Sequence, residues 1–185
     1  KGILSSLLMV SLSGCVSPPA KLVRDNFNFA PYGLVPVNVA IIDVVDNYKS
    51  PSKAPNVEHL FNTSLSDGLR QLVNERLEAR GNDGALTITI VDAHVIAEKL
   101  DKAEGMQAYF TKQADKRYDG RMEILLTLNA PKRDLVGEVR IVAERSMTSL
   151  EGATLADKDA LWFNLSEQML IDISNELDKL FTEKM

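Results

Sequence analysis

Two runs of alternating residues, separated by a short turn, constrain the fold of this chain more than any other feature. In the run at 121–129, every second residue is apolar, as at Met122, Ile124, Leu126 and Leu128. In the run at 135–147, apolar residues alternate with Glu138, Arg140 and Glu144. Alternation with a period of two places apolar side chains on one face of a strand, and the turn residues "APKRD" join the runs. The sequence therefore predicts an antiparallel hairpin with one buried face.

Two further strands are predicted upstream of this hairpin. Residues 85–98 follow the turn "GNDG", and their apolar phase slips after Ile90, which predicts a β-bulge near Asp92. Residues 35–46, "VPVNVAIIDVVD", are largely apolar on both faces. That pattern is typical of a strand that is covered on both sides or central in a sheet.

Helical spacing of apolar residues predicts two helices. The first runs from Val57 to Arg80, with Asn56 as the N-cap and Gly81 at the C′ position. The second begins at a capping box of Thr154 and Asp157 and runs through Leu180. The order is strand-helix-strand-strand-strand-helix. This order predicts an α+β fold, a two-layer sandwich in which two helices pack on one face of a four-stranded mixed sheet.

The N-terminal segment carries a targeting signal. Residues 3–12 are mostly apolar, follow a lysine, and are too few to span a bilayer, which takes about 20 apolar residues. A basic start, a short apolar stretch and small residues at its end are the parts of a secretory signal peptide, here residues 1–14. Cys15 follows directly and is the only cysteine in the chain, which excludes an internal disulfide framework.

The residues Leu12-Ser13-Gly14-Cys15 resemble the lipobox of bacterial lipoproteins. This resemblance implies that the chain is cut before Cys15, which then carries acyl chains on its sulfur and nitrogen as a membrane anchor. Two or more chains hold a protein stably, at about 0.8 kcal/mol per buried CH₂ group. Val16, where an Asp would mark inner-membrane retention, implies the outer membrane, facing the periplasm. An incidental cysteine in an ordinary secreted protein is the alternative.

The remaining residues divide into an arm and one domain. Residues 15–36 hold several prolines and predict a tether that becomes an ordered arm near Phe27, Phe29 and Tyr32. Residues 37–185 are predicted to form a single periplasmic α+β domain. Without residues 1–14 the chain has 20 basic and 26 acidic residues, a balance of −6, because the removed segment contains one of the 21 basic residues. This balance argues against a nucleic-acid partner.

The sequence lacks the usual signatures of catalysis. His59 and His94 have no histidine or cysteine partner at metal-ligand spacing, so no metal and no cofactor are expected. Two carboxylate pairs leave a carboxylate-dependent envelope hydrolase as an alternative function; they are Asp43 with Asp46, and Asp157 with Asp159. We expect a protein that is not an enzyme.

Two segments supply candidate residues for binding a partner. The connection at 99–120 is long for a structureless loop and mixes lysines with apolar residues. It is either a flap that faces a partner or a lipid, or a cap on the core with solvated lysines. In the second predicted helix, additional apolar residues widen the apolar face. This face packs either against a partner or against the sheet. The candidates are Met106, Tyr109, Phe110, Arg117, Phe163 and Leu170.

The lipobox, the element order and the size together resemble small outer-membrane lipoproteins that are auxiliary components of ABC-type and MCE-type lipid transport. The stretch "RYDG" at 117–120 is similar to one in the PqiC-like branch, and "ARG" at 79–81 is similar to one in YajG-like lipoproteins. The resemblance implies a non-enzymatic binding or scaffold module that docks on an envelope protein complex and is linked to lipid transport between membranes. A lipid-binding cup lined by the sheet is a further alternative, and it requires a cavity of a few hundred Å³.

Overall fold

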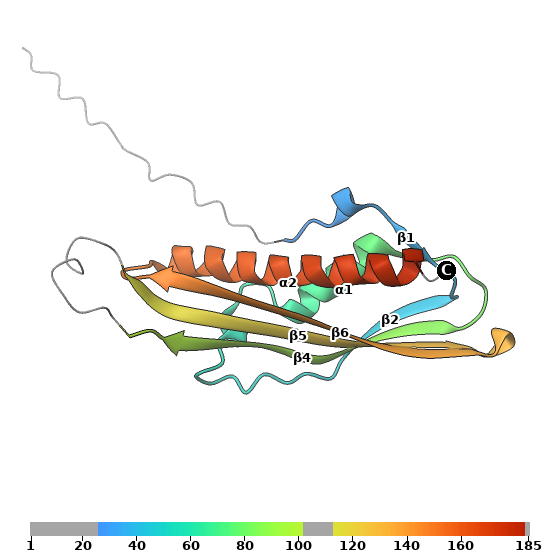
Figure 1. Cartoon of the computed structure of the whole chain (residues 1–185), viewed down its shortest axis with the longest axis horizontal. Coiled ribbons are helices and arrows are strands. Elements are labelled where there is room, and N and C mark those ends of the chain that lie inside the picture. Colours follow the sequence, from blue (N-terminus) through green and yellow to red (C-terminus); the bar gives the residue numbers. More distant parts are fainter. Residues whose placement is uncertain (1–25, 102–112, 184–185) are drawn as a thin grey trace, which may run out of the picture.

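The computed structural model describes residues 26–101 and 113–183. Across these residues, two α-helices pack on one face of a four-stranded sheet, and a two-stranded sheet lies beside them (Figure 1). The α+β class and the two-layer arrangement are as predicted. The elements are β1 (Val35–Val37), β2 (Ile41–Asp46), α1 (Leu65–Arg76), β3 (Leu77–Ala79), β4 (Ala85–Lys99), β5 (Ala114–Ala130), β6 (Leu135–Leu150) and α2 (Leu155–Glu183).

The larger sheet has the order β2-β4-β5-β6. The strands β2 and β4 are parallel, whereas β4 with β5 and β5 with β6 are antiparallel, so the sheet is mixed as predicted. The predicted hairpin is β5–β6, joined by a 3₁₀ turn at Pro131–Arg133. The register of β4 against β5 shifts between Ile90 and Asp92, which confirms the predicted bulge.

Apolar side chains fill the space between the sheet and the helices. The inward residues of β4 and β5 meet Leu165, Met169 and Ile173 of α2, which are completely buried. The helix approaches so closely at Gly120 that a Cβ there would lie 2.9 Å from the sulfur of Met169. Around these residues, the side of the sheet that faces the helices is therefore a packed core.

The prediction of one strand over residues 35–46 was wrong. The chain bends after Val37, so β1 pairs with β3 in the smaller parallel sheet, and β2 joins the larger sheet as an edge strand rather than a central one. Ile41 is accordingly 59% exposed. The bend is held by the N–H of Gly81, which donates to the carbonyl of Val39 at 2.9 Å. A Cβ on Gly81 would lie 2.6 Å from the Val39 nitrogen, so only glycine fits.

The predicted start of the first helix was also wrong. The helix α1 begins at Leu65, where the Ser64 side chain accepts a hydrogen bond from the Asp67 N–H at 3.0 Å. Residues 55–57 instead pair with β4, since the Val57 N–H donates to the Val95 carbonyl at 2.9 Å. Beyond its bulge, β4 no longer has β2 as a neighbour. Residues 55–57 take the place of β2 there and form hydrogen bonds with the backbone of β4.

The C-terminal end of α1 also differs from the prediction. Strand pairing with β1, which lies far away in the sequence, overrides the helical spacing of the apolar residues. The helix ends at Arg76, and residues 77–79 form β3 against β1. Gly81 is therefore not a helix C′ residue.

The second helix begins as predicted. The N–H and hydroxyl of Thr154 each donate to Asp157 Oδ2 at 2.8 Å, and the Asp157 N–H donates back to Thr154 Oγ1 at 3.2 Å. Phe27 and Phe29, which precede β1, are buried in the core. In the described parts of the chain, neither helix combines the length and the low charge that crossing a membrane requires.

Candidate functional site

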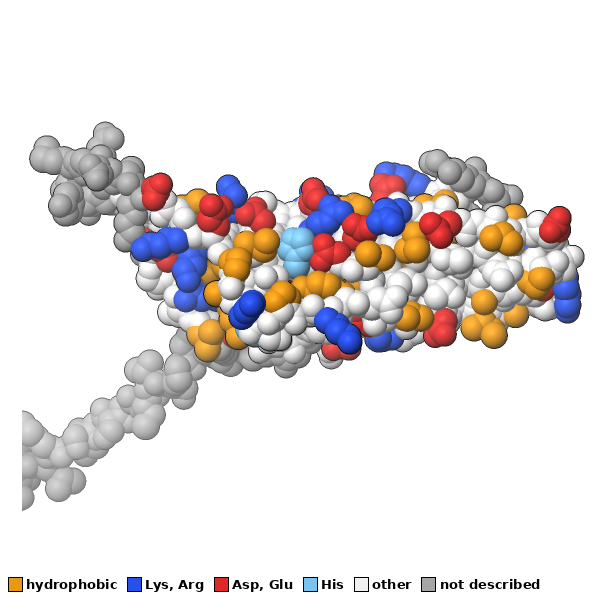
Figure 2. All heavy atoms as spheres, turned by 90° about the horizontal axis from the view of Figure 1, so that it is seen from below, with side chains coloured by type: hydrophobic (Ala, Val, Ile, Leu, Met, Phe, Trp, Pro, Cys, Tyr) orange, Lys and Arg blue, Asp and Glu red, His pale blue; other side chains and the backbone are white. Residues whose placement is uncertain are grey.

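The face of the larger sheet that the helices leave uncovered carries charged side chains from three adjacent strands. Figure 2 shows this open face, with acidic and basic side chains interspersed around a histidine. We call these residues the charge lattice: Asp92, His94, Glu98, Arg117, Asp119, Arg121, Glu123, Arg140 and Glu144. Successive side chains of a strand point to opposite faces of the sheet, and these residues occupy the positions that point away from the core.

Arg121 lies at the centre of the charge lattice. Its guanidinium pairs with Glu144 on β6, with Glu123 on its own strand at 2.5 Å, and with Asp92 on β4 at 3.5 Å. Glu123 also forms an ion pair with Arg140 of β6. One arginine therefore links three strands, and the planar guanidinium, with its five N–H donors, suits such multiple contacts.

A second group of contacts continues the lattice toward the end of β4. Arg117 pairs with Asp119 and with Glu98, each at 2.8 Å, and the Ser146 hydroxyl donates to Asp119 at 2.5 Å. His94 Nδ1 lies 2.9 Å from the Asp92 carboxylate. These contacts hold the exposed side chains in defined positions across the open face.

The lattice keeps its central carboxylates ionised. Hydrogen bonds from Arg121 and the charge of Arg140 lower the pKa of Glu123. Burial raises the pKa of Asp119, but the hydrogen bonds from Ser146 and Arg117 outweigh it, so the pKa is lowered. A general acid must be protonated near the working pH, and these two carboxylates are not. A lowered pKa therefore does not favour either carboxylate as a general acid.

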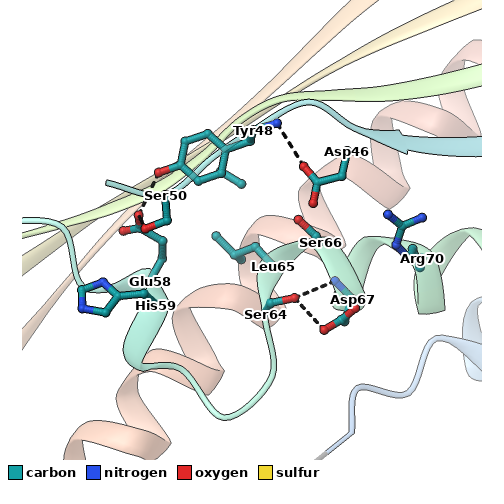
Figure 3. A pocket seen from close by; sticks show the side chains of 11 residues that line it. Asp46, Tyr48, Ser50, Glu58, His59, Ser64, Leu65, Ser66, Asp67 and Arg70 are labelled. Carbon is teal, nitrogen blue, oxygen red and sulfur yellow. Dashed lines mark hydrogen bonds between the residues drawn. The ribbon is translucent and has the colours of Figure 1, made fainter. Parts of the chain in front are cut away.

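A pocket of about 280 Å³ lies beside the start of α1 (Figure 3). Its wall includes Glu58, which is buried and accepts hydrogen bonds from Tyr48 at 2.8 Å, Ser50 at 2.5 Å and the Val95 N–H at 3.1 Å. Burial raises the pKa of Glu58, but these hydrogen bonds outweigh it and lower the pKa. Burial and the bond to Glu58 raise the pKa of Tyr48. Glu58 thus ties the loop after β2 to β4.

Replacing Glu58 with glutamine is expected to lower the free energy of unfolding at pH 7 by about 1–3 kcal/mol, because buried donors lose a charged acceptor. The pKa of Glu58 is depressed in the folded state, so the charge stabilises the fold above pH 4.5 and this contribution is lost as the pH falls through the folded pKa. Urea unfolding at pH 7 and at decreasing pH measures both effects. The variant should lose less stability on acidification than the native chain.

Glu78→Gln is the matched control, because Glu78 is an exposed carboxylate that pairs only with exposed Arg80 among the described residues. It should leave the urea midpoint nearly unchanged. Equal stability of Glu58→Gln and the native chain at pH 7 would contradict a structural role for Glu58.

The structure separates the predicted partner-binding residues. Leu170 is completely buried, and Phe163 stacks on Phe27 with ring centroids 4.7 Å apart, so the second helix uses its widened apolar face for the core. A Cβ on Gly68 of α1 would lie 2.6 Å from Leu170, which shows how closely the helices pack there. Arg117 is half-exposed within the charge lattice. Met106, Tyr109 and Phe110 lie outside the described residues.

The candidate catalytic pairs do not form a shared cleft. Asp43 and Asp46 lie three residues apart on β2, so the strand's alternation points their side chains to opposite faces. Asp157 caps α2 through its bonds with Thr154. Within residues 26–101 and 113–183, no cluster of three or more His, Cys, Asp or Glu side chains could hold a metal ion.

Sequence reasoning identified only part of the charge lattice. It placed Glu138, Arg140 and Glu144 on the outward face of the last strand, which the register against β5 confirms. It gave no importance to Arg121 or Glu123. The feature that could have indicated them is the presence of opposite charges at outward positions of neighbouring strands. This feature is informative only when the strand register is known, because the register decides which charges lie opposite each other.

Comparisons with known proteins give fold-level similarities only. No protein-family model and no curated protein sequence matches the chain. Among solved structures, the chain is similar to rare lipoprotein B from Shewanella oneidensis, with 10% identity and a TM-score of 0.42 over 78% of this chain and 96% of that one. It is also similar to a minor lipoprotein from Acinetobacter baumannii, with 10% identity and a TM-score of 0.40 over 77% and 90% of the two chains. Similarity at this level assigns neither a family nor a function.

Proposed function

We propose that this chain is a lipid-anchored protein of the cell envelope that acts by binding another envelope protein and not by catalysis. The observation that carries the proposal is the open sheet face, on which paired charges are held in fixed positions while the opposite face is packed against helices. Surfaces with complementary charges steer association and fix the orientation of a partner.

The anchor in this proposal is Cys15, within the lipobox-like sequence "LSGC". Phe27 is buried in the core, so the domain begins 12 residues after the cysteine (27 − 15). A chain of that length reaches about 40 Å when fully extended. A lipidated Cys15 would therefore hold the domain close to its membrane, which we infer to be the outer membrane, with the domain facing the periplasm.

The partner is inferred to be a protein complex of the envelope. Charges of both signs lie interspersed on the open face, which fits a folded protein surface with a matching pattern better than a uniformly charged polymer. A role as an auxiliary component of lipid transport between membranes is the finer part of this proposal. It is supported by the short likeness of residues 117–120 to the PqiC-like branch.

Replacing Cys15 with serine is expected to abolish lipid attachment at residue 15, because the serine hydroxyl does not replace the thiol that receives the lipid, and any copies that are still cut should leave the membrane fraction. Cell fractionation and intact-mass measurement check this result. Ser13→Ala is the matched control, since it keeps a small residue before the cut and should leave the protein anchored. A native protein whose mass shows an unmodified cysteine would refute the anchor.

A photo-crosslinking residue tests the binding face in cells. Placed at Thr127, on the open face, it should give one defined crosslinked product with another protein, whereas placement at the exposed Asn175 on α2 should not. The product should disappear when Arg121 is changed to glutamate, because this reversal breaks the centre of the lattice. Equal crosslinking from both positions, or a product that persists in the Arg121→Glu variant, would argue against this face.

A further inference from the structure

The edge strand β6 exposes apolar side chains along its first half. In the described structure β6 is the last strand of the larger sheet, so one row of its backbone N–H and C=O groups has no strand beside it. Leu135, Val136, Val139 and Val142 are all exposed, and Val136 reaches 74%. Such an edge is a template for pairing with another strand.

These apolar residues lie on both faces of the strand. The alternation of β6 points Leu135 and Val139 to the side of the helices, and Val136 and Val142 to the open face. A Cβ on Gly137 would meet nothing within 4 Å, so α2 does not cover the strand at this point. An added strand would therefore pair with the backbone and cover apolar side chains on both faces at once.

The second half of β6 is different. Glu144 pairs with Arg121, and Arg145 pairs with Asp172 of α2 at 2.6 Å. Apart from Leu150 at its far end, the exposed apolar residues of β6 thus stop at Val142. The edge that is free to pair is the stretch 135–143.

We propose that two copies of this chain form a dimer by antiparallel pairing of residues 135–143 of their β6 strands, with the two-fold axis at Val139. This interface goes beyond the proposed function and uses a different surface from the centre of the charge lattice. A two-fold axis that pairs antiparallel strands is perpendicular to the sheet, so each side chain stays on its own face. The two larger sheets would then join into one continuous sheet.

This register places apolar residues against apolar residues. Residues whose numbers sum to 278 lie opposite each other, so Val136 meets Val142 of the second copy and Val139 meets its own equivalent. Leu135 lies opposite Ala143 of the second copy, and Gly137 lies opposite Ile141. Each exposed apolar residue of the stretch therefore has an apolar neighbour across the interface.

Charge selects this register over its neighbours. Glu138 lies opposite Arg140 of the second copy, and the two-fold axis repeats this pair. Moving the axis by one residue would place either Glu138 or Arg140 opposite its own equivalent, which is a like-charge contact and destabilising. Within the described residues Glu138 forms no ion pair in its own chain, so it is available to Arg140 of the second copy, which also contacts Glu123 of its own chain.

Charge reversal tests the register. The full chain in detergent, studied by sedimentation equilibrium at matched detergent density, is expected to be a dimer. Glu138→Arg and Arg140→Glu should each raise the dimer dissociation constant by about tenfold or more, because each creates two like-charge contacts. The double variant should restore dimerisation. Thr148→Arg, on the same strand and face but outside the paired stretch, should have no effect.

A cysteine crosslink locates the axis independently. In a full chain with Cys15→Ser, Val139→Cys should form a covalent dimer with a short bis-maleimide, because the two residues at 139 lie opposite each other. Thr148→Cys should not, since it would lie far from its equivalent. A monomeric native chain at tens of micromolar, equal crosslinking at both positions, or failure of the double variant to restore the dimer after circular dichroism shows it folded, would overturn the proposal.

Discussion

Replacing Arg76 with methionine is expected to lower the free energy of unfolding by about 2–4 kcal/mol, because several hydrogen bonds to its charge are lost while Asp178, which is 38% exposed, regains part of its hydration. Arg76 is 2% exposed at the end of α1. Its Nε donates to the Gly33 carbonyl at 2.6 Å, and its guanidinium bonds to Ser174 and, at 2.5 Å, to Asp178 of α2. The methionine variant would leave these acceptors without their donor.

The position of Arg76 explains why the effect should be large. One side chain joins α1 to α2 and to the arm, where it also lies over the ring of Tyr32 at 5.5 Å. Methionine has most of the volume of arginine, so the decrease in the free energy of unfolding comes from the lost polar contacts more than from a cavity. Urea unfolding at pH 7 measures it.

Arg80→Met is the matched control for Arg76→Met. Arg80 lies four residues further along the chain, is well exposed, and pairs with exposed Glu78. Its replacement should leave the urea midpoint nearly unchanged. The second change Asp178→Asn, made in the Arg76→Met chain, should recover part of the loss, because it removes the carboxylate charge left unpaired. An Arg76→Met chain as stable as the native one would show that these bonds contribute nothing net.

Replacing Gly84 with alanine is expected to lower the free energy of unfolding by about 2–5 kcal/mol, from two separate effects. Gly84 has a φ of +78°, which disfavours a side chain by about 1–2 kcal/mol. A Cβ there would also press against the carbonyl oxygen of Asn129 and lie 2.6 Å from the Cα of Ala130. Those atoms are backbone at the end of β5, so the sheet must shift, and overpacking of this kind costs about 1–3 kcal/mol.

Gly152→Ala separates the two effects of the Gly84 substitution. Gly152 has a similar φ of +72°, but a Cβ there would meet nothing within 4 Å. The Gly152→Ala variant should lose only the stability that comes from placing a side chain at a positive φ. Its urea midpoint should therefore fall less than that of Gly84→Ala. Equal losses in the two variants would mean that the contact with β5 is relieved without cost.

Elements that depend on short-range patterns could be predicted from the sequence. The β5–β6 hairpin follows from alternation on either side of a turn, and the bulge in β4 follows from a slip in that alternation. The start of α2 follows from two residues, Thr154 and Asp157, which cap the helix through bonds to each other. Each of these signals lies within a few residues of the structure it determines.

Elements whose partners lie far away in the chain could not be predicted. Residues 57–64 have helical spacing, yet Val57 pairs with β4 because the end of that strand lacks another neighbour. The apolar run at 35–46 divides between two sheets because the chain near Gly81 packs against its middle. The same limit applies to the surface, since sequence reasoning placed Leu170 among the partner-binding candidates but the packing of α1 buries it.

By itself, the sequence determined the element types of the hairpin and of the second helix, the α+β class, and the lipobox-like segment before the domain. Only the tertiary structure decided which strands are edges, where α1 begins, and which charges meet around Arg121. The physical reason is that side-chain periodicity is a local property of the chain. Strand register and burial instead depend on contacts between residues far apart in sequence, and no local pattern specifies these contacts.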